Sequence, residues 1–207
     1  MNDRTGSQPA AALLLVDVQN DFCPGGALPV PQGDRVVPVL NDYAHRFTKR
    51  RLPVYASRDW HPPATRHFQP QGGPWPPHCV QETRGAELHP DLELPADAVV
   101  VSKGMSSEDH GYSAFEATTP AGVRLAESLR KQGVRRLFVG GLATDYCVRA
   151  SVLDAARAGF ETVLLLDAIR GIDVQPGDTA RAVDEMLRAG ARSATLETVN
   201  AELAGGG

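Results

Sequence analysis

Short runs of apolar residues alternate along the chain with longer stretches in which apolar residues recur every three or four positions. Most of the short runs are continuously apolar, which is typical of strands that are covered on both faces. They predict six strands, at residues 12–18, 54–57, 98–102, 136–139, 162–166 and 193–196.

The longer stretches predict helices between most of these strands. Val36, Leu40, Tyr43 and Phe47 form one apolar stripe at helical spacing. Similar stripes occupy residues 123–129, 148–156 and 180–187. This alternation predicts a parallel sheet with helices on both faces, and active sites in such folds lie at the carboxyl ends of the strands.

Length and composition narrow the class of protein further. The 207 residues suffice for one well-buried domain and are short for two, so we expect one domain over residues 1–207 with loose tails at 1–9 and 205–207. A net charge of −4 gives no electrostatic reason to expect nucleic acid or a membrane as a partner, and favours a small-molecule substrate. We interpret the apolar run at 10–16 as a buried strand rather than an export signal, which predicts a cytoplasmic protein with three reduced cysteines.

Three reactive side chains follow predicted strands. Asp17 closes the first strand, Lys103 closes the third, and Cys147 follows the fourth after a turn, at the start of a helix. A helix N-terminus and a nearby ammonium group lower the pKa of a thiol, and an aspartate can take its proton. Each residue alone also fits a structural role, as a core thiol, a surface lysine or a turn-forming aspartate. Their coincidence at strand ends favours catalysis.

A second group of polar residues surrounds the stretch 61–95, which is rich in Pro and Gly and holds four of the six histidines. An irregular segment of this length inside a domain is usually functional. Asp59 and His61 point to the same side of an extended chain, and a loop can bring His78 to them, which suits a zinc, iron or manganese ion. The alternatives are a histidine-containing surface loop and a site in which Cys79 is a ligand.

Three aromatic residues, Phe22, Trp75 and Tyr112, lie close in sequence to these polar groups. They fit either ordinary packing under a long loop or a clamp for a flat ring.

The candidate residues belong to short motifs that occur in order from about Leu13 to Ile172. The motifs are Asp17-Val18-Gln19-Asn20-Asp21-Phe22, Ser57-Arg58-Asp59-Trp60-His61, Trp75-Pro76-Pro77-His78-Cys79, Lys103-Gly104, Tyr112-Ser113-Ala114-Phe115 and Thr144-Asp145-Tyr146-Cys147-Val148. Each is weakly specific, but the ordered combination closely resembles the nicotinamidase (pyrazinamidase) branch of the isochorismatase-like hydrolases.

The resemblance implies a three-layer α/β/α sandwich with a central six-stranded, mostly parallel sheet. It implies a catalytic triad of Asp17, Lys103 and Cys147. It also implies a cis peptide before Ala143, with the N–H groups of Ala143 and Cys147 forming an oxyanion hole. The residues expected to contact the substrate are Phe22, Trp75, Tyr112 and Ala143.

The resemblance further implies one divalent metal ion held by Asp59, His61 and His78, with zinc as the first choice and iron or manganese as alternatives. Many family members have a histidine where Thr65 stands and a serine where His67 stands. A few have a histidine at this later position, where it is a fourth ligand, so we also expect His67 to be a metal ligand.

The implied activity is metal-dependent hydrolysis of nicotinamide to nicotinate and ammonia through a thioester on Cys147, in NAD salvage, with pyrazinamide as a second substrate. Homo-oligomerisation stays open. The nearest alternative is a related amidase that acts on another small carboxamide or ureido compound. The complete triad disfavours a catalytically silent metal-binding scaffold, and the chain has no His-Glu-x-x-His helix of a zinc protease.

Overall fold

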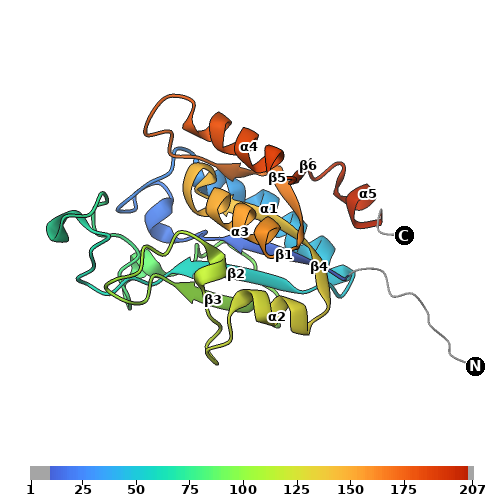
Figure 1. Ribbon diagram of the computed structural model, residues 1–207, viewed down its shortest axis with the longest axis horizontal. Coiled ribbons are helices and arrows are strands. Elements are labelled where there is room, and N and C mark those ends of the chain that lie inside the picture. The colour runs from blue at the N-terminus through green and yellow to red at the C-terminus, as the bar shows by residue number, and fades with distance from the viewer. Residues whose placement is uncertain (1–9, 205–207) are drawn as a thin grey trace, which may run out of the picture.

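The computed structural model describes residues 10–204, so the tails expected at 1–9 and 205–207 lie outside the described residues. Within this range, one sheet has the strand order β3-β2-β1-β4-β5-β6, and every neighbouring pair is parallel (Figure 1). The strands are β1 (Ala10–Val16), β2 (Val54–Asp59), β3 (Val99–Lys103), β4 (Val134–Leu142), β5 (Glu161–Arg170) and β6 (Arg192–Ala194). The α-helices are α1 (Val36–Lys49), α2 (Leu125–Lys131), α3 (Arg149–Arg157), α4 (Asp178–Arg188) and α5 (Val199–Ala204).

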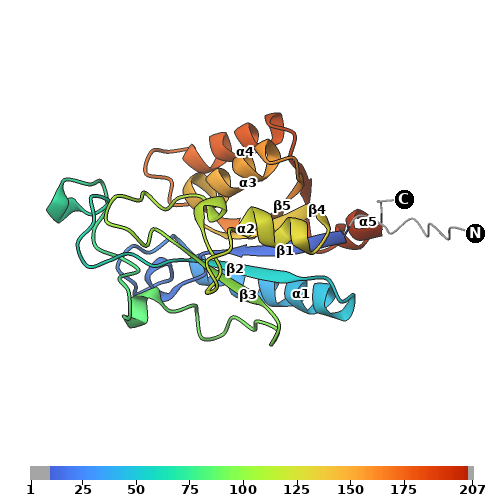
Figure 2. The same cartoon turned by 60° about the horizontal axis from the view of Figure 1, so that its bottom comes forward.

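Two groups of helices cover opposite faces of the sheet (Figure 2). α1 and α5 pack on one face, and α2, α3 and α4 pack on the other. Side chains of β1 alternate between the two layers: Leu13 and Leu15 join the first, whereas Leu14 and Val16 join the second. Complete burial of such a side chain stabilises the fold by roughly 1.5–3 kcal/mol. The expected three-layer sandwich is therefore confirmed.

The apolar stripe of α1 faces the sheet as its spacing predicts, with Val36, Leu40, Tyr43 and Phe47 fully buried. The Tyr43 hydroxyl donates a hydrogen bond of 2.8 Å to Asp167 Oδ1, so the buried polar atom has a partner.

The observed elements differ from the predicted ones mainly at their ends. β4 and β5 are longer than predicted, and β1 begins and ends two residues earlier. The short helix α5 was not predicted, because six residues carry too little of a periodic pattern. The turn before α3 is a π-helical turn over Thr144–Val148 rather than regular α-helix.

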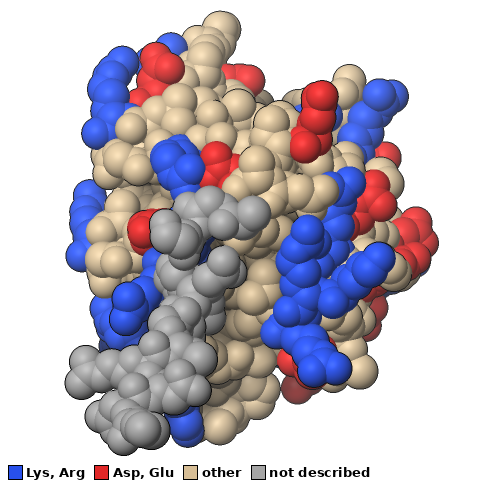
Figure 3. Space-filling view, turned by 90° about the vertical axis from the view of Figure 1, so that its right-hand side faces the viewer, with Lys and Arg blue, Asp and Glu red and all other residues tan. Residues whose placement is uncertain are grey.

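The strand order reverses between β1 and β4, because the chain moves outward from β1 through β2 to β3 and then returns to the other side of β1. Ligands of open α/β sheets bind at such a point, beyond the carboxyl ends of the strands. The long connection between β2 and β3 extends beyond this end of the sheet, whereas α5 lies at the opposite end (Figure 1). Figure 3 views that opposite end, where groups of Lys and Arg side chains gather with fewer Asp and Glu between them. None of the described helices is long and apolar enough to cross a membrane.

Candidate active site

Asp17, Lys103 and Cys147 meet beyond the carboxyl ends of β1, β3 and β4, as the sequence predicts. Lys103 Nζ lies 2.8 Å from Asp17 Oδ2 and 3.5 Å from Cys147 Sγ. One carboxylate oxygen of Asp17 and the sulfur of Cys147 belong to a group of atoms that all lie within 4.8 Å of one another. All three side chains are buried. The arrangement places a thiol, a carboxylate and a cation within reach of one proton transfer.

The carboxyl group of Asp17 is suited to accept a proton near neutral pH. Burial raises its pKa, Lys103 lowers it and Asp59 raises it again, with the result at about 6. Ser57 Oγ donates a hydrogen bond of 2.7 Å to Asp17 Oδ1 and orients the carboxylate. A base whose pKa lies close to the working pH is ionised and still a useful proton acceptor.

The thiol of Cys147 is neutral at rest, in contrast to the lowered pKa that the sequence predicts. Burial raises its pKa well above the ordinary value, Lys103 lowers it, and Asp17 and Asp59 raise it. The sequence indicates the lysine and the helix end but not the burial of the sulfur, and burial has the larger effect. The thiol must therefore give its proton to a base as it attacks.

The turn that carries Cys147 is held by hydrogen bonds within its own backbone and by the side chain of Ser151. A cis peptide precedes Ala143, as the resemblance implies. Ala143 O accepts hydrogen bonds of 3.1 Å from the N–H groups of Tyr146 and Val148. Ser151 Oγ donates a hydrogen bond of 2.6 Å to Cys147 O. The role of the Ala143 and Cys147 N–H groups as an oxyanion hole stays a prediction.

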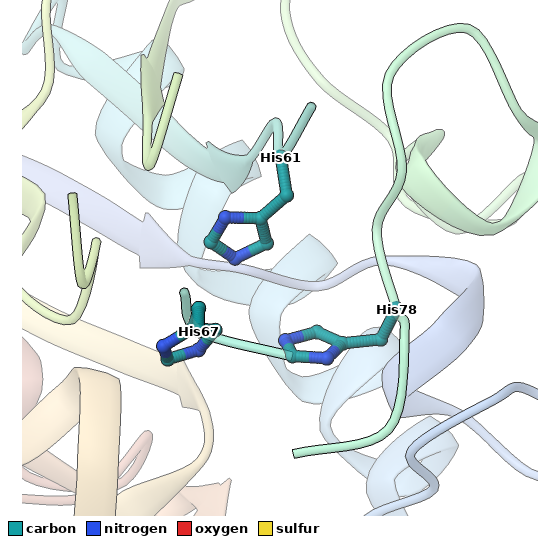
Figure 4. Close-up of side chains that lie close together, drawn as sticks. All are labelled: His61, His67 and His78. Atoms are coloured by element: carbon teal, nitrogen blue, oxygen red, sulfur yellow. The ribbon is translucent and has the colours of Figure 1, made fainter. Parts of the chain in front are cut away.

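His61, His67 and His78, here called the histidine cluster, point toward one another (Figure 4). One ring nitrogen of each belongs to a group of atoms within 4.8 Å of one another, and all three residues are buried. Nδ1 of His61 lies 3.1 Å from the Gly104 carbonyl, and Nδ1 of His78 lies 2.8 Å from the Pro76 carbonyl. A neutral ring that donates through Nδ1 keeps Nε2 as a free acceptor.

The histidine cluster fits a metal ion. His61 Nε2 and His67 Nδ1 are buried without a hydrogen-bond partner among the described residues. Burial, together with the neighbouring His61 and His78, lowers the pKa of His67 to about 3, and burial also lowers the pKa of His78. Neutral imidazoles with converging, unpaired nitrogen atoms are the ligands that zinc and related divalent ions prefer.

Asp59 links the histidine cluster to the triad. Its Oδ2 lies 3.7 Å from His61 Nε2, and its Oδ1 accepts a hydrogen bond from Lys103 Nζ. Burial raises the pKa of Asp59, but Lys103 and His61 lower it below its ordinary value, so the carboxylate is ionised. Cys79, the rival ligand, belongs to neither group of potential metal ligands found among residues 10–204.

One cavity joins the thiol to the histidine cluster. Its walls are Phe22, Leu28, Asp59, His67, Trp75, His78, Gly111, Tyr112, Ala143, Tyr146, Cys147 and Ile172. All four residues expected to contact a substrate are among them. Leu28, Gly111, Tyr146 and Ile172 are additional. The pattern of the sequence indicated none of them, apart from the position of Tyr146 directly before Cys147.

Aromatic rings form a continuous part of this wall. Tyr146 packs edge-on against Trp75, with ring centroids 4.9 Å apart, and stacks with Tyr112 at 6.0 Å. Trp75 Nε1 donates a hydrogen bond of 2.9 Å to the Tyr112 hydroxyl. The three rings hold one another in the wall of the cavity.

The structure shows how Thr65 and His67 are placed relative to the histidine cluster. Thr65 is buried. Its hydroxyl donates a hydrogen bond of 3.1 Å to Ser107 O and accepts one of 3.3 Å from His67 N. His67, and not Thr65, faces the other two histidines.

Residues 11–198 match the family model described as an isochorismatase domain. The chain is 43% identical over 204 residues to the nicotinamidase of Escherichia coli (strain K12), covering 91% of this chain and 96% of that protein. The pyrazinamidase of Pyrococcus horikoshii in complex with zinc superposes with a TM-score of 0.83 and 47% identity, covering 90% and 99% of the two chains. PnC1 from L. infantum in complex with nicotinate superposes with a TM-score of 0.81 and 35% identity, covering 91% and 94%. The chain therefore belongs to the isochorismatase family, and its predicted resemblance to the nicotinamidases and pyrazinamidases within that family is confirmed.

Proposed function

We propose that this amidohydrolase converts nicotinamide to nicotinate and ammonia, with pyrazinamide as a second substrate. The observation that carries the proposal is a cavity that Cys147 of the triad lines together with His67 and His78 of the histidine cluster and with aromatic side chains. The names of the similar proteins support it, since one is a nicotinamidase, one is a pyrazinamidase and one is in complex with nicotinate.

In this mechanism Cys147 attacks the carboxamide carbon while Asp17 takes the thiol proton. Burial lowers the pKa of Lys103, but Asp17 and Asp59 raise it well above its ordinary value, so its ammonium group stays charged and stabilises the developing thiolate. Asp17 returns its proton to the departing ammonia. It then takes a proton from the water molecule that hydrolyses the thioester and passes this proton to the departing sulfur of Cys147, which releases the acid and restores both the thiol and the carboxylate.

The negative charge that develops on the carboxamide oxygen needs donors close to Cys147. The N–H groups of Ala143 and Cys147 would supply them, and each such donor contributes about 3–4 kcal/mol in comparable sites.

The histidine cluster and Asp59 would hold one divalent ion, with zinc as the first choice and iron or manganese as alternatives. The unpaired nitrogen atoms of the cluster support this, as does the zinc in the P. horikoshii protein. When bound, the ion supplies a Lewis-acidic centre that can coordinate a ring nitrogen. Phe22, Trp75 and Tyr112 would hold the ring of the substrate so that its carboxamide faces Cys147.

We place the reaction in NAD salvage in the cytoplasm, as the sequence predicts. The alternative substrates are carbamoyl or ureido compounds, which have no ring nitrogen to use the histidine cluster.

Ammonia release from the purified protein tests the proposal. Nicotinamide, pyrazinamide and an N-carbamoyl amino acid are compared before chelation, after chelation and after zinc is restored. We expect turnover of the two ring amides only, lost on chelation and regained with zinc. Turnover of the carbamoyl compound alone would overturn the assigned substrate class.

A further inference from the structure

Gln19 is a buried polar residue that the proposed mechanism does not use. It lies two residues after Asp17, is fully buried and is not part of the cavity wall. Its carboxamide makes two hydrogen bonds to the backbone of Asp59: Nε2 donates to Asp59 O, and Asp59 N donates to Oε1, both at 2.8 Å. Nε2 also donates to Ala86 O at 2.9 Å. These partners leave one consistent orientation of the amide group.

The contact between Gln19 and Asp59 is needed because the backbone pairing of β1 with β2 ends just before it. The hydrogen bond of 3.2 Å from Asp17 N to Ser57 O is the last between the backbones of these two chain segments. Asp17 then adopts a φ of 49°, and its carbonyl accepts a hydrogen bond from Gln19 N instead of continuing the ladder. The N–H and C=O groups of Asp59 therefore face a strand that has turned away, and such buried groups are costly without partners. The Gln19 side chain replaces the missing peptide group.

The backbone of Asp59 determines where its carboxylate lies. That carboxylate contacts Lys103 Nζ on one side and His61 Nε2, at 3.7 Å, on the other. On the remaining side of β2 the backbone is held by the ladder to β3, through the hydrogen bond of 2.9 Å from Trp60 N to Lys103 O. Without Gln19, only that one side of the strand end would be fixed.

We propose that Gln19 is a positioning residue, whose carboxamide holds the Asp59 backbone so that the Asp59 carboxylate faces the histidine cluster while it stays paired with Lys103. The inference rests on the metal site proposed above. It assigns to Gln19 an effect on metal affinity that is separate from the reactivity of the thiol.

The substitution Gln19→Met tests this, because it keeps the length of the side chain and removes its hydrogen bonds. Asn20→Ala is the matched control, since Asn20 Nδ2 donates to Arg84 O at 2.7 Å in the same turn as Ala86 and none of its hydrogen bonds reaches Asp59. Two quantities are measured on the full chain: the dissociation constant of Zn²⁺ against a chromophoric chelator, and the rate of iodoacetamide alkylation of the peptide that contains Cys147.

We expect Gln19→Met to weaken Zn²⁺ binding by roughly 10–100-fold, the usual cost of removing a group that orients a metal ligand, with an unchanged alkylation rate. Asn20→Ala should alter neither quantity. A folded Gln19→Met protein with unchanged Zn²⁺ affinity would overturn the inference, whereas absence of Zn²⁺ binding to the unsubstituted chain would overturn the metal site itself.

Gln19→Glu is the second variant, for the case that Gln19→Met does not fold by circular dichroism. It keeps an acceptor for Asp59 N but places a carboxylate against Asp59 O, so weaker Zn²⁺ binding is again expected. Failure of both variants to fold, while Asn20→Ala folds, would show that Gln19 serves the fold rather than the metal site.

Discussion

The triad and the histidine cluster lie side by side but are held in different ways. Asp17 and Lys103 directly follow or end sheet strands, and their backbones belong to the ladders of β1, β2 and β3. His67 and His78 stand on an irregular connection that is fastened by individual hydrogen bonds, such as the one of 2.7 Å from Cys79 N to Asp21 Oδ2. The comparison teaches that the proposed base and its cation rest on the sheet, whereas two of the proposed metal ligands rest on a loop that many separate contacts must hold.

The largest effect is expected from a substitution that disables the triad and leaves the histidine cluster intact. Cys147→Ala removes the proposed nucleophile and should lower kcat by at least about 10⁴-fold. Zn²⁺ affinity should stay unchanged, because Cys147 is not in the histidine cluster. Single-turnover assays and metal titration check both parts. Near-normal hydrolysis by this variant would remove Cys147 from the mechanism.

Lys103→Met should disturb both the triad and the site around the histidine cluster. It leaves the buried carboxylates of Asp17 and Asp59 facing each other without the ammonium group that contacts them both. We expect activity to be lost and the free energy of unfolding to fall by about 3–5 kcal/mol. Urea denaturation measures this, with Lys131→Met as the control because Lys131 is exposed on α2. A stable and active variant would contradict the shared role of Lys103.

His67→Ala should disrupt the histidine cluster and leave the triad intact. We expect Zn²⁺ affinity to fall by at least the roughly 10–100-fold that is lost when only the orientation of a ligand is disturbed. Alkylation of Cys147 should continue at its normal rate. His45→Ala, on the exposed side of α1, is the control. Unchanged metal affinity would show that His67 is a buried residue and not a metal ligand.

The pH dependence of kcat/KM tests the role of Asp17 in the triad without a substitution. The pKa of Asp17 is about 6, raised by burial, and the residue must be ionised to accept the thiol proton. Activity is therefore expected to fall as pH decreases through about 6, by about tenfold for each further unit. A profile that stays flat through this range would exclude Asp17 as the base.

The smallest effect concerns the aromatic wall that both regions share. Tyr146→Leu removes the ring that contacts Trp75 and Tyr112, and such contacts contribute about 0.5–1.5 kcal/mol. We expect KM for nicotinamide to rise roughly 2–10-fold with little change in kcat. Tyr146→Phe keeps the ring and should behave as the unsubstituted chain. A fall in kcat alone would instead assign Tyr146 to the positioning of the nucleophile.

The sequence by itself determined the elements and much of the chemistry. Continuous apolar runs predict strands because both faces of this sheet are covered, and residues that follow parallel strands must gather at one end of the sheet. The sequence alone therefore places Asp17, Lys103 and Cys147 together. Phe22, Trp75 and Tyr112 could likewise be named as candidates for a wall around a flat ring, and all three line the cavity.

Only the tertiary structure decided how these groups behave. Burial, which depends on the packing of all three layers, raises the pKa of the Cys147 thiol where its local sequence predicted a decrease. The contact of Gln19 with Asp59 joins residues 40 positions apart and follows from the point at which β1 turns away, which no periodic pattern records. Local patterns report the elements, but solvent exclusion and long-range hydrogen bonds arise only when the elements are packed together.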